Sequence, residues 1–150
     1  MGETANLSQP IVETLYCEAL VLADEVRMIF NPGEQKSACT SETCIQIAHA
    51  TEGLRATTRM MFILAWLLNY RAHFSGDLSE AQLLRSGPFQ ADRPGDPESM
   101  ALLPPHVRNL IMETQKLHAR IARLDSAWRS RTHTEPPLIA SIHERLTRAI

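Results

Sequence analysis

The 150-residue chain is short of the residues from which most reactive sites are built. It has three cysteines, Cys17, Cys39 and Cys44, an odd number without closely repeated pairs, which argues against a disulfide scaffold and a zinc site. No glycine-rich loop could hold a phosphate, and no serine lies in a G-x-S-x-G turn. No carboxylate–histidine pairs have di-iron spacing. We therefore predict no catalytic residue, no cofactor and no metal ion, and expect that the protein is not an enzyme.

Long hydrophobic runs and a strong charge excess are also missing. The longest apolar run, 60–68, has nine residues, whereas a membrane-spanning helix needs about 20. The net charge of −2 lacks the basic excess of a typical nucleic-acid-binding domain. The first ten residues contain neither the basic segment nor the apolar core of a signal peptide. We expect a cytoplasmic protein that binds no membrane, and we do not expect nucleic acid as its partner.

The charges that are present are separated along the chain. Residues 1–35 carry six acidic residues and one basic residue, whereas residues 104–131 carry six basic and two acidic residues. Such segments can lie side by side within one helical bundle, and we favour this interpretation. The basic segment leaves a nucleic-acid-associated regulator as an alternative function.

Helical periodicity appears in two stretches whose hydrophobic residues form a single face. In the first, at about 10–30, apolar residues recur every three or four positions and an NPG sequence follows. In the other, at about 104–131, a prolyl pair precedes a regular apolar seam. The first helix should bury Ile11, Leu15, Ala19, Leu22, Val26 and Ile29; the last should bury Val107, Leu110, Thr114, Leu117, Ile121, Leu124 and Trp128.

A second helix should cover about 41–74, where no proline interrupts the sequence. A capping-box pattern then starts a short helix at Ser79, and the proline-rich residues 86–105 should form a loop. We predict an all-α fold, a three-helix bundle with two or three long helices, one short connecting helix and a C-terminal tail segment. The bundle should span residues 1–131 and the tail 132–150.

The second helix has apolar residues on two faces. One apolar seam runs along its whole length, and we assign this seam to the bundle core. The other face is charged in the first half of the helix and apolar in the second half. In the second half both faces are therefore apolar, and a three-helix bundle cannot cover both. We therefore predict a homodimer with Phe62, Trp66 and Tyr70 in or near its interface. The whole-length seam comprises Ile47, Leu54, Met61, Ala65, Leu68 and Ala72.

The charged part of that second face suggests ion pairs. Glu52 is three residues before Arg55 and can pair with it, and Asp125 is a candidate partner for Arg59. The alternative is that both arginines are solvated, because exposed ion pairs contribute at most about 1 kcal/mol.

The C-terminal tail is a candidate partner-binding segment. Its apolar residues recur at helical spacing behind a Pro-Pro hinge, so the tail could dock as a helix into a groove on another protein. Alternatively it packs on its own bundle or on a dimer mate. The residues concerned are Leu138, Ile139, Ile142 and Leu146.

Two long segments resemble the alphaproteobacterial family of regulators of CtrA degradation, a former domain of unknown function. They are TEGLRATTRMMFILAWLLNYRA at 51–72 and LLPPHVRNLIMETQKLHARIARLD at 102–125. The first carries the pattern E-x-x-R-x-T-T-R-x-M followed by W-L-L-x-x-R-A, and the second carries L-P and an R-I-x-R-L-D run. The chain departs from the family at Gly53, where serine is expected, and at His118, where tyrosine is expected.

The resemblance implies a homodimeric three-helix bundle with a flexible C-terminal tail and without enzymatic activity. Members of that family act as adaptors that help a primed ClpXP protease receive cell-cycle regulators, together with a receiver-domain protein and a cyclic-di-GMP-binding effector. The expected partners are thus a second copy, a ClpXP-associated priming factor and substrate proteins. A purely structural dimerisation module remains a further alternative.

Overall fold

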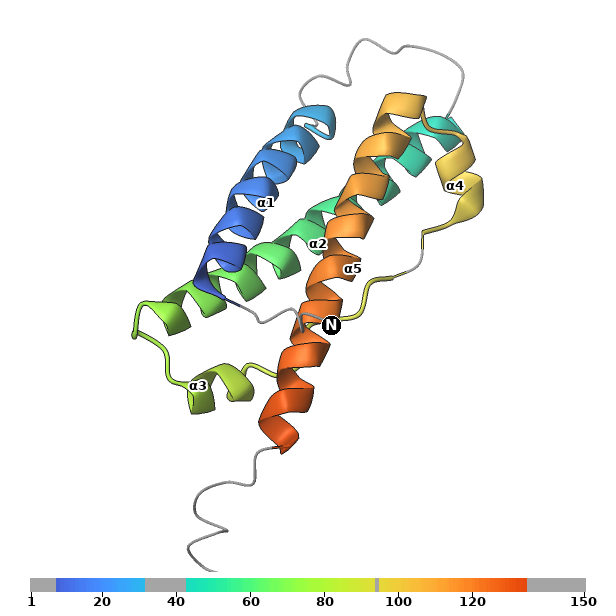
Figure 1. Cartoon of the computed structure of the whole chain (residues 1–150). Coiled ribbons are helices and arrows are strands. Elements are labelled where there is room, and N and C mark those ends of the chain that lie inside the picture. Colours follow the sequence, from blue (N-terminus) through green and yellow to red (C-terminus); the bar gives the residue numbers. More distant parts are fainter. Residues whose placement is uncertain (1–7, 32–42, 94, 135–150) are drawn as a thin grey trace, which may run out of the picture.

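The computed structural model describes residues 8–31, 43–93 and 95–134. These residues form α-helices and no strand, so the predicted all-α bundle is confirmed. Three helices are long and two are short (Figure 1): α1 (Gln9–Ile29), α2 (Thr43–Phe74), α3 (Glu80–Arg85), α4 (Pro97–Ala101) and α5 (Pro105–Thr134). No helix in the described part of the chain is long and apolar enough to cross a membrane.

The three long helices pack against one another around one main core. The predicted face of α1 is buried at Leu15, Ala19, Leu22 and Val26, while Ile11 lies at its edge. The seam of α5 is also largely as predicted, and its last members are partly buried. Residues of α5 in the core clusters include Val107, Leu110, Ile111, Leu117 and Ile121. Periodicity alone was sufficient for these two helices because each has a single apolar face.

The acidic first helix and the basic last helix lie side by side, as the charge separation suggests (Figure 1). Glu18 of α1 and Arg120 of α5 form an ion pair of 3.5 Å. Both side chains are about half exposed, so this pair contributes little to stability and mainly matches the two surfaces.

The orientation of α2 differs from the prediction. Its predicted core seam faces solvent, and Leu54 and Met61 are 69% and 64% exposed. The face that carries Glu52 and Arg59 is the one that packs into the bundle. Both faces contain large apolar residues, so hydrophobic periodicity could not decide between them. The face with Glu52 and Arg59 packs inward with the apolar residues that join the main core, and each of these two charges has a hydrogen-bond partner there.

The connection between α2 and α5 is more ordered than the predicted loop. The capping box of α3 is present, because Ser79 and Gln82 exchange side-chain and backbone hydrogen bonds. The short helix α4 was not predicted; it begins after Asp96, whose side chain accepts a hydrogen bond from the Glu98 backbone N–H. Between α3 and α4, residues 86–93 run between α2 and α5, and we name them the strap. Gly87 adopts a φ of 78°, which favours glycine where the strap leaves α3.

Candidate binding surface along helix α2

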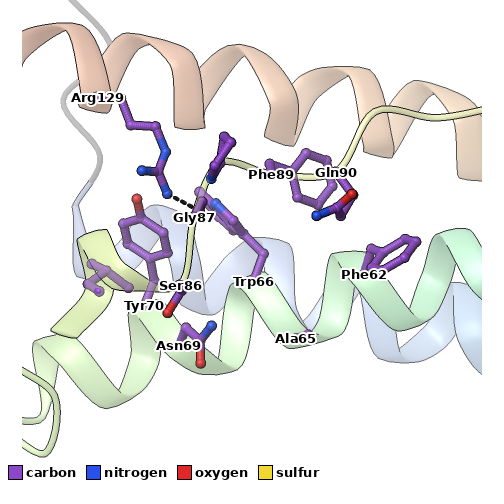
Figure 2. Close-up of a pocket in the computed structure, with 12 residues that line it drawn as sticks. Phe62, Ala65, Trp66, Asn69, Tyr70, Ser86, Gly87, Phe89, Gln90 and Arg129 are labelled. Carbon is purple, nitrogen blue, oxygen red and sulfur yellow. Dashed lines mark hydrogen bonds between the residues drawn. The ribbon is translucent and has the colours of Figure 1, made fainter.

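The strap is fixed in place by polar side chains of α5. Asp125 is buried, and its carboxylate accepts hydrogen bonds from the Trp66 indole N–H at 2.9 Å and the Phe89 backbone N–H at 3.0 Å. The same carboxylate pairs with Arg129 at 3.0 Å, and Arg129 also donates to the Gly87 carbonyl oxygen (Figure 2). One buried acid thus joins α2, α5 and the strap.

Further along the strap, two more side chains hold it. His118 Nε2 lies 2.9 Å from the Gln90 carbonyl oxygen, so this nitrogen donates the hydrogen bond. The Phe89 ring packs between His118 and Trp66, with centroid distances of 4.5 and 6.3 Å. Phe89 therefore supplies apolar cover for the face of α2 that we had assigned to a second copy.

Arg59 makes the third attachment, from α2. Its Nε binds Asp92 at 2.8 Å and its Nη1 binds Thr114 at 2.8 Å, whereas Nη2 has no hydrogen-bond partner among the described residues. The predicted pairing of Arg59 with Asp125 therefore needs correction: the acid that binds Arg59 is on the strap, and Asp125 binds Arg129. Residues 86–93 have no periodicity, and this geometry was not readable from sequence.

The other suggested pair is formed. Glu52 Oε1 lies 2.6 Å from Arg55 Nη1, with Glu52 buried and Arg55 partly exposed. Glu52 Oε2 has no hydrogen-bond partner within the described residues. The four motif residues Glu52, Arg55, Arg59 and Asp125 thus sit in the interior or at its edge rather than on a solvated face.

Two concavities lie where the strap meets α2. The first, which we name the anchor pocket, has a volume of about 220 Å³ and mainly apolar walls (Figure 2). Trp66 and Phe89 point toward it, and Phe62 marks its other end. Its remaining lining residues are Ala65, Asn69, Tyr70, Leu83, Ser86, Gly87, Pro88, Gln90 and Arg129.

Tyr70 is a hydrogen-bond donor at one end of the anchor pocket. Its hydroxyl is buried and makes no hydrogen bond of normal geometry within the described residues. Burial and the nearby Asp125 carboxylate raise the pKa of Tyr70 well above its ordinary value. The phenol therefore stays protonated and able to donate throughout the physiological pH range.

The second concavity, the arginine groove, has a volume of about 470 Å³. Its walls include Arg55, Arg59 and Arg93 but only one acid, Asp92. Apolar surface comes from Leu54 and Phe62, and the other lining residues are Thr51, Thr58, Gln90, Ala91 and His118. Phe62 and Gln90 line both concavities, so the arginine groove and the anchor pocket adjoin.

The solvent-exposed side of α2 carries a regular apolar stripe. Large residues recur every seven positions, at Ile47, Leu54, Met61 and Leu68, and all four are exposed. Four positions after each of them stands a small residue: Thr51, Thr58, Ala65 and Ala72. We name these eight residues the heptad face. The sequence shows the seven-residue spacing but not that this seam faces solvent, because a core seam and an exposed stripe have the same period.

The three residues predicted at a dimer interface differ in their exposure. Trp66 and Tyr70 are only 7% and 2% exposed because the strap and α5 cover them, so they offer little side-chain surface to another chain. Phe62 is 40% exposed and remains available beside the heptad face. The dimer itself stays a prediction. The tail residues Leu138, Ile139, Ile142 and Leu146 lie outside the described residues.

A family model described as "Protein of unknown function (DUF1465)" matches residues 3–150. No curated protein and no solved structure matches the chain.

Proposed function

The chain belongs to this DUF1465 family of unknown function, and we propose that it is a non-enzymatic, cytoplasmic adaptor that binds other proteins. The observation that carries the proposal is the heptad face. Leu54, Met61 and their neighbours expose large apolar side chains over several turns of one helix. Contiguous exposed apolar surface of this kind marks protein interaction sites, because it is costly to leave in water.

We assign the heptad face to a second copy of the chain because its pattern is self-complementary. If two α2 helices pair antiparallel about a twofold axis, Ile47 lies opposite Ala72 of the second copy and Leu54 lies opposite Ala65. In the same register, Met61 faces Thr58 and Leu68 faces Thr51. Each large side chain then meets a small one, which allows close helix packing, and one patch serves both subunits.

Cysteine crosslinking tests this register. In a background with the three natural cysteines replaced by serine, Leu54→Cys and Ala65→Cys proteins should form a disulfide dimer when mixed and oxidised. Neither protein should crosslink alone, because equivalent positions are offset by about 16 Å along the helix in this register. Crosslinking of each protein alone would instead indicate parallel helices. A monomer in sedimentation well above micromolar concentration would remove the dimer from the proposal.

The delivery of proteins to ClpXP is supported by the resemblance of residues 51–72 and 102–125 to the regulators of CtrA degradation. The proposed mechanism is tethering: one surface binds protease-associated factors and another holds the substrate, so that the substrate's effective concentration at the unfoldase rises. The C-terminal tail is the candidate for one of these contacts.

A reconstituted degradation assay tests delivery. Purified ClpXP, the priming factors and a cell-cycle regulator are combined with and without this protein, and the substrate's half-life is measured. Full-length protein should shorten the half-life, and protein lacking residues 135–150, which keeps all of α5, should not. Equal half-lives with and without the full-length protein would contradict the adaptor function.

The basic residues of α5 give little support to the alternative function of a nucleic-acid-associated regulator. Lys116 pairs with Glu113 at 2.8 Å, Arg120 with Glu18, and Arg129 with Asp125. These partners neutralise half of the six cations on which that alternative depends. Salt-dependent retardation of labelled duplex DNA by the intact protein would revive it.

A further inference from the structure

We propose that the anchor pocket and the arginine groove together bind one extended peptide segment of a partner protein, with an apolar side chain in the pocket and a carboxylate in the groove. This inference rests on the proposed adaptor function and names the chemistry of a partner segment. It concerns the junction of α2 with the strap and not the pairing of α2 with a second copy.

The pocket has the size and lining for one side chain. Its volume of about 220 Å³ is below the range of about 300–1,000 Å³ typical of small-molecule sites. Phe62, Pro88 and Phe89 give it accessible apolar walls, whereas Trp66 and Leu83 also line it but are almost fully buried. Burying a leucine or phenylalanine side chain here would remove both surfaces from water.

The groove has the charge for a carboxylate. Arg59 is buried with Nη2 unpaired, Arg55 makes a single ion pair with Glu52, and Arg93 makes none within the described residues. Asp92, which binds Arg59 Nε, is the one acid in the groove lining. A buried guanidinium N–H without an acceptor is unfavourable, and an arginine–carboxylate hydrogen bond is among the strongest that a peptide can supply.

The separation of the two subsites sets the spacing of the ligand's side chains. Arg59 and Trp66 are seven residues apart on α2, which corresponds to about 10.5 Å along the helix axis. A peptide in the extended polyproline II conformation advances about 3.1 Å per residue with three residues per turn, so side chains three positions apart lie on the same side. The acidic residue and the apolar residue should therefore be three positions apart.

An array of capped hexapeptides tests the inference with the full-length protein. Each peptide carries one aspartate and one leucine or phenylalanine in a serine–glycine background, at every separation and in both orders. Binding should be strongest at a separation of three, and replacing aspartate with asparagine should weaken it by about tenfold. Absence of binding at about 100 μM, or binding that ignores the aspartate, would overturn the proposal.

Two pairs of variants show whether the array reports this site. Arg93→Glu reverses a groove charge and should weaken the best peptide about tenfold, whereas Arg85→Glu, an exposed arginine of α3 outside both concavities, should leave it unchanged. Gln90→Trp should obstruct the junction, and Gln90→Ala should not. Thermal unfolding followed by circular dichroism confirms that each variant is folded. Equal binding by Arg93→Glu and Arg85→Glu would overturn the proposal.

Two further measurements separate this inference from its premises. Inorganic phosphate should compete only weakly with the peptide, and phosphate that binds more tightly than every peptide would replace the peptide site with a simple anion site. Dimerisation and substrate degradation are measured on the same variants. Suppose that the unaltered protein binds no peptide, and that Arg93→Glu still dimerises and still supports degradation. The adaptor function would then be retained and the peptide site at the junction would be rejected.

Discussion

Both faces of α2 carry large apolar residues, but the buried face also carries charges. The face toward the bundle contains the charged residues Glu52 and Arg59, and the face toward solvent contains Leu54 and Met61. The difference lies in what each face contacts. The buried charges have partners on the same helix, on the strap and on α5, whereas Leu54 and Met61 mainly face solvent. The apolar residues of the buried face form the main core, and its two charges can be buried there because they have partners.

The largest expected effect comes from removing a buried charge. Arg59→Met should lower the free energy of unfolding by about 3–5 kcal/mol, because it leaves Thr114 and Asp92 without their common donor and releases the strap. Leu54→Gln on the opposite face should change it by about 0.5 kcal/mol or less. Urea unfolding at a concentration where the protein is monomeric measures both. Similar losses in the free energy of unfolding for the two variants would contradict this difference between the faces of α2.

The exposed face should matter for association instead. Met61→Glu should weaken self-association by about 100-fold, because the proposed register places it beside the twofold axis and buries two carboxylates close together. Val21→Glu, at an exposed apolar residue of α1, is the matched control and should leave association unchanged. Sedimentation equilibrium measures the dissociation constants. If both variants associate like the unaltered protein, a different occupant covers this face.

These contrasts show which parts of the molecule were accessible from sequence. The first and last long helices could be predicted, because each has one apolar face and a proline or glycine signal at one of its ends. The orientation of α2 could not be predicted, because the sequence does not distinguish a buried arginine from a solvated one until its partners are known. Asp92 binds Arg59 across 33 positions of the chain, and nothing in the aperiodic residues 86–93 predicts that contact. The five-residue helix α4 is too short to show a period; its Asp-Pro start was the available signal.

The buried face should also make the protein sensitive to high pH. Tyr70 has a raised pKa in the folded protein, so above pH 10 the unfolded chain releases this proton while the folded chain retains it. The contribution of Tyr70 is therefore complete below pH 10 and falls with rising pH, by up to about 1.4 kcal/mol per pH unit. Tyr70→Phe should remove this part of the loss. Urea unfolding between pH 9 and pH 11 measures the slope, and equal slopes for the two proteins would contradict the assignment.

The smallest expected effect concerns Gly53, which lies on the buried face of α2 next to the exposed Leu54. An added Cβ would come within 2.5 Å of Phe30 Cδ1, so Gly53→Ala sets a helix-propensity gain of about 1 kcal/mol against displacement of the Phe30 ring. We expect a net loss of about 1 kcal/mol in the unaltered background and a net gain once Phe30→Ala opens the space. A double-mutant cycle from urea unfolding yields the coupling. The effect of Leu54→Ala should not depend on Phe30. A sign change found only at position 53 would show that contact with Phe30, and not helix propensity, determines which residue this face accepts.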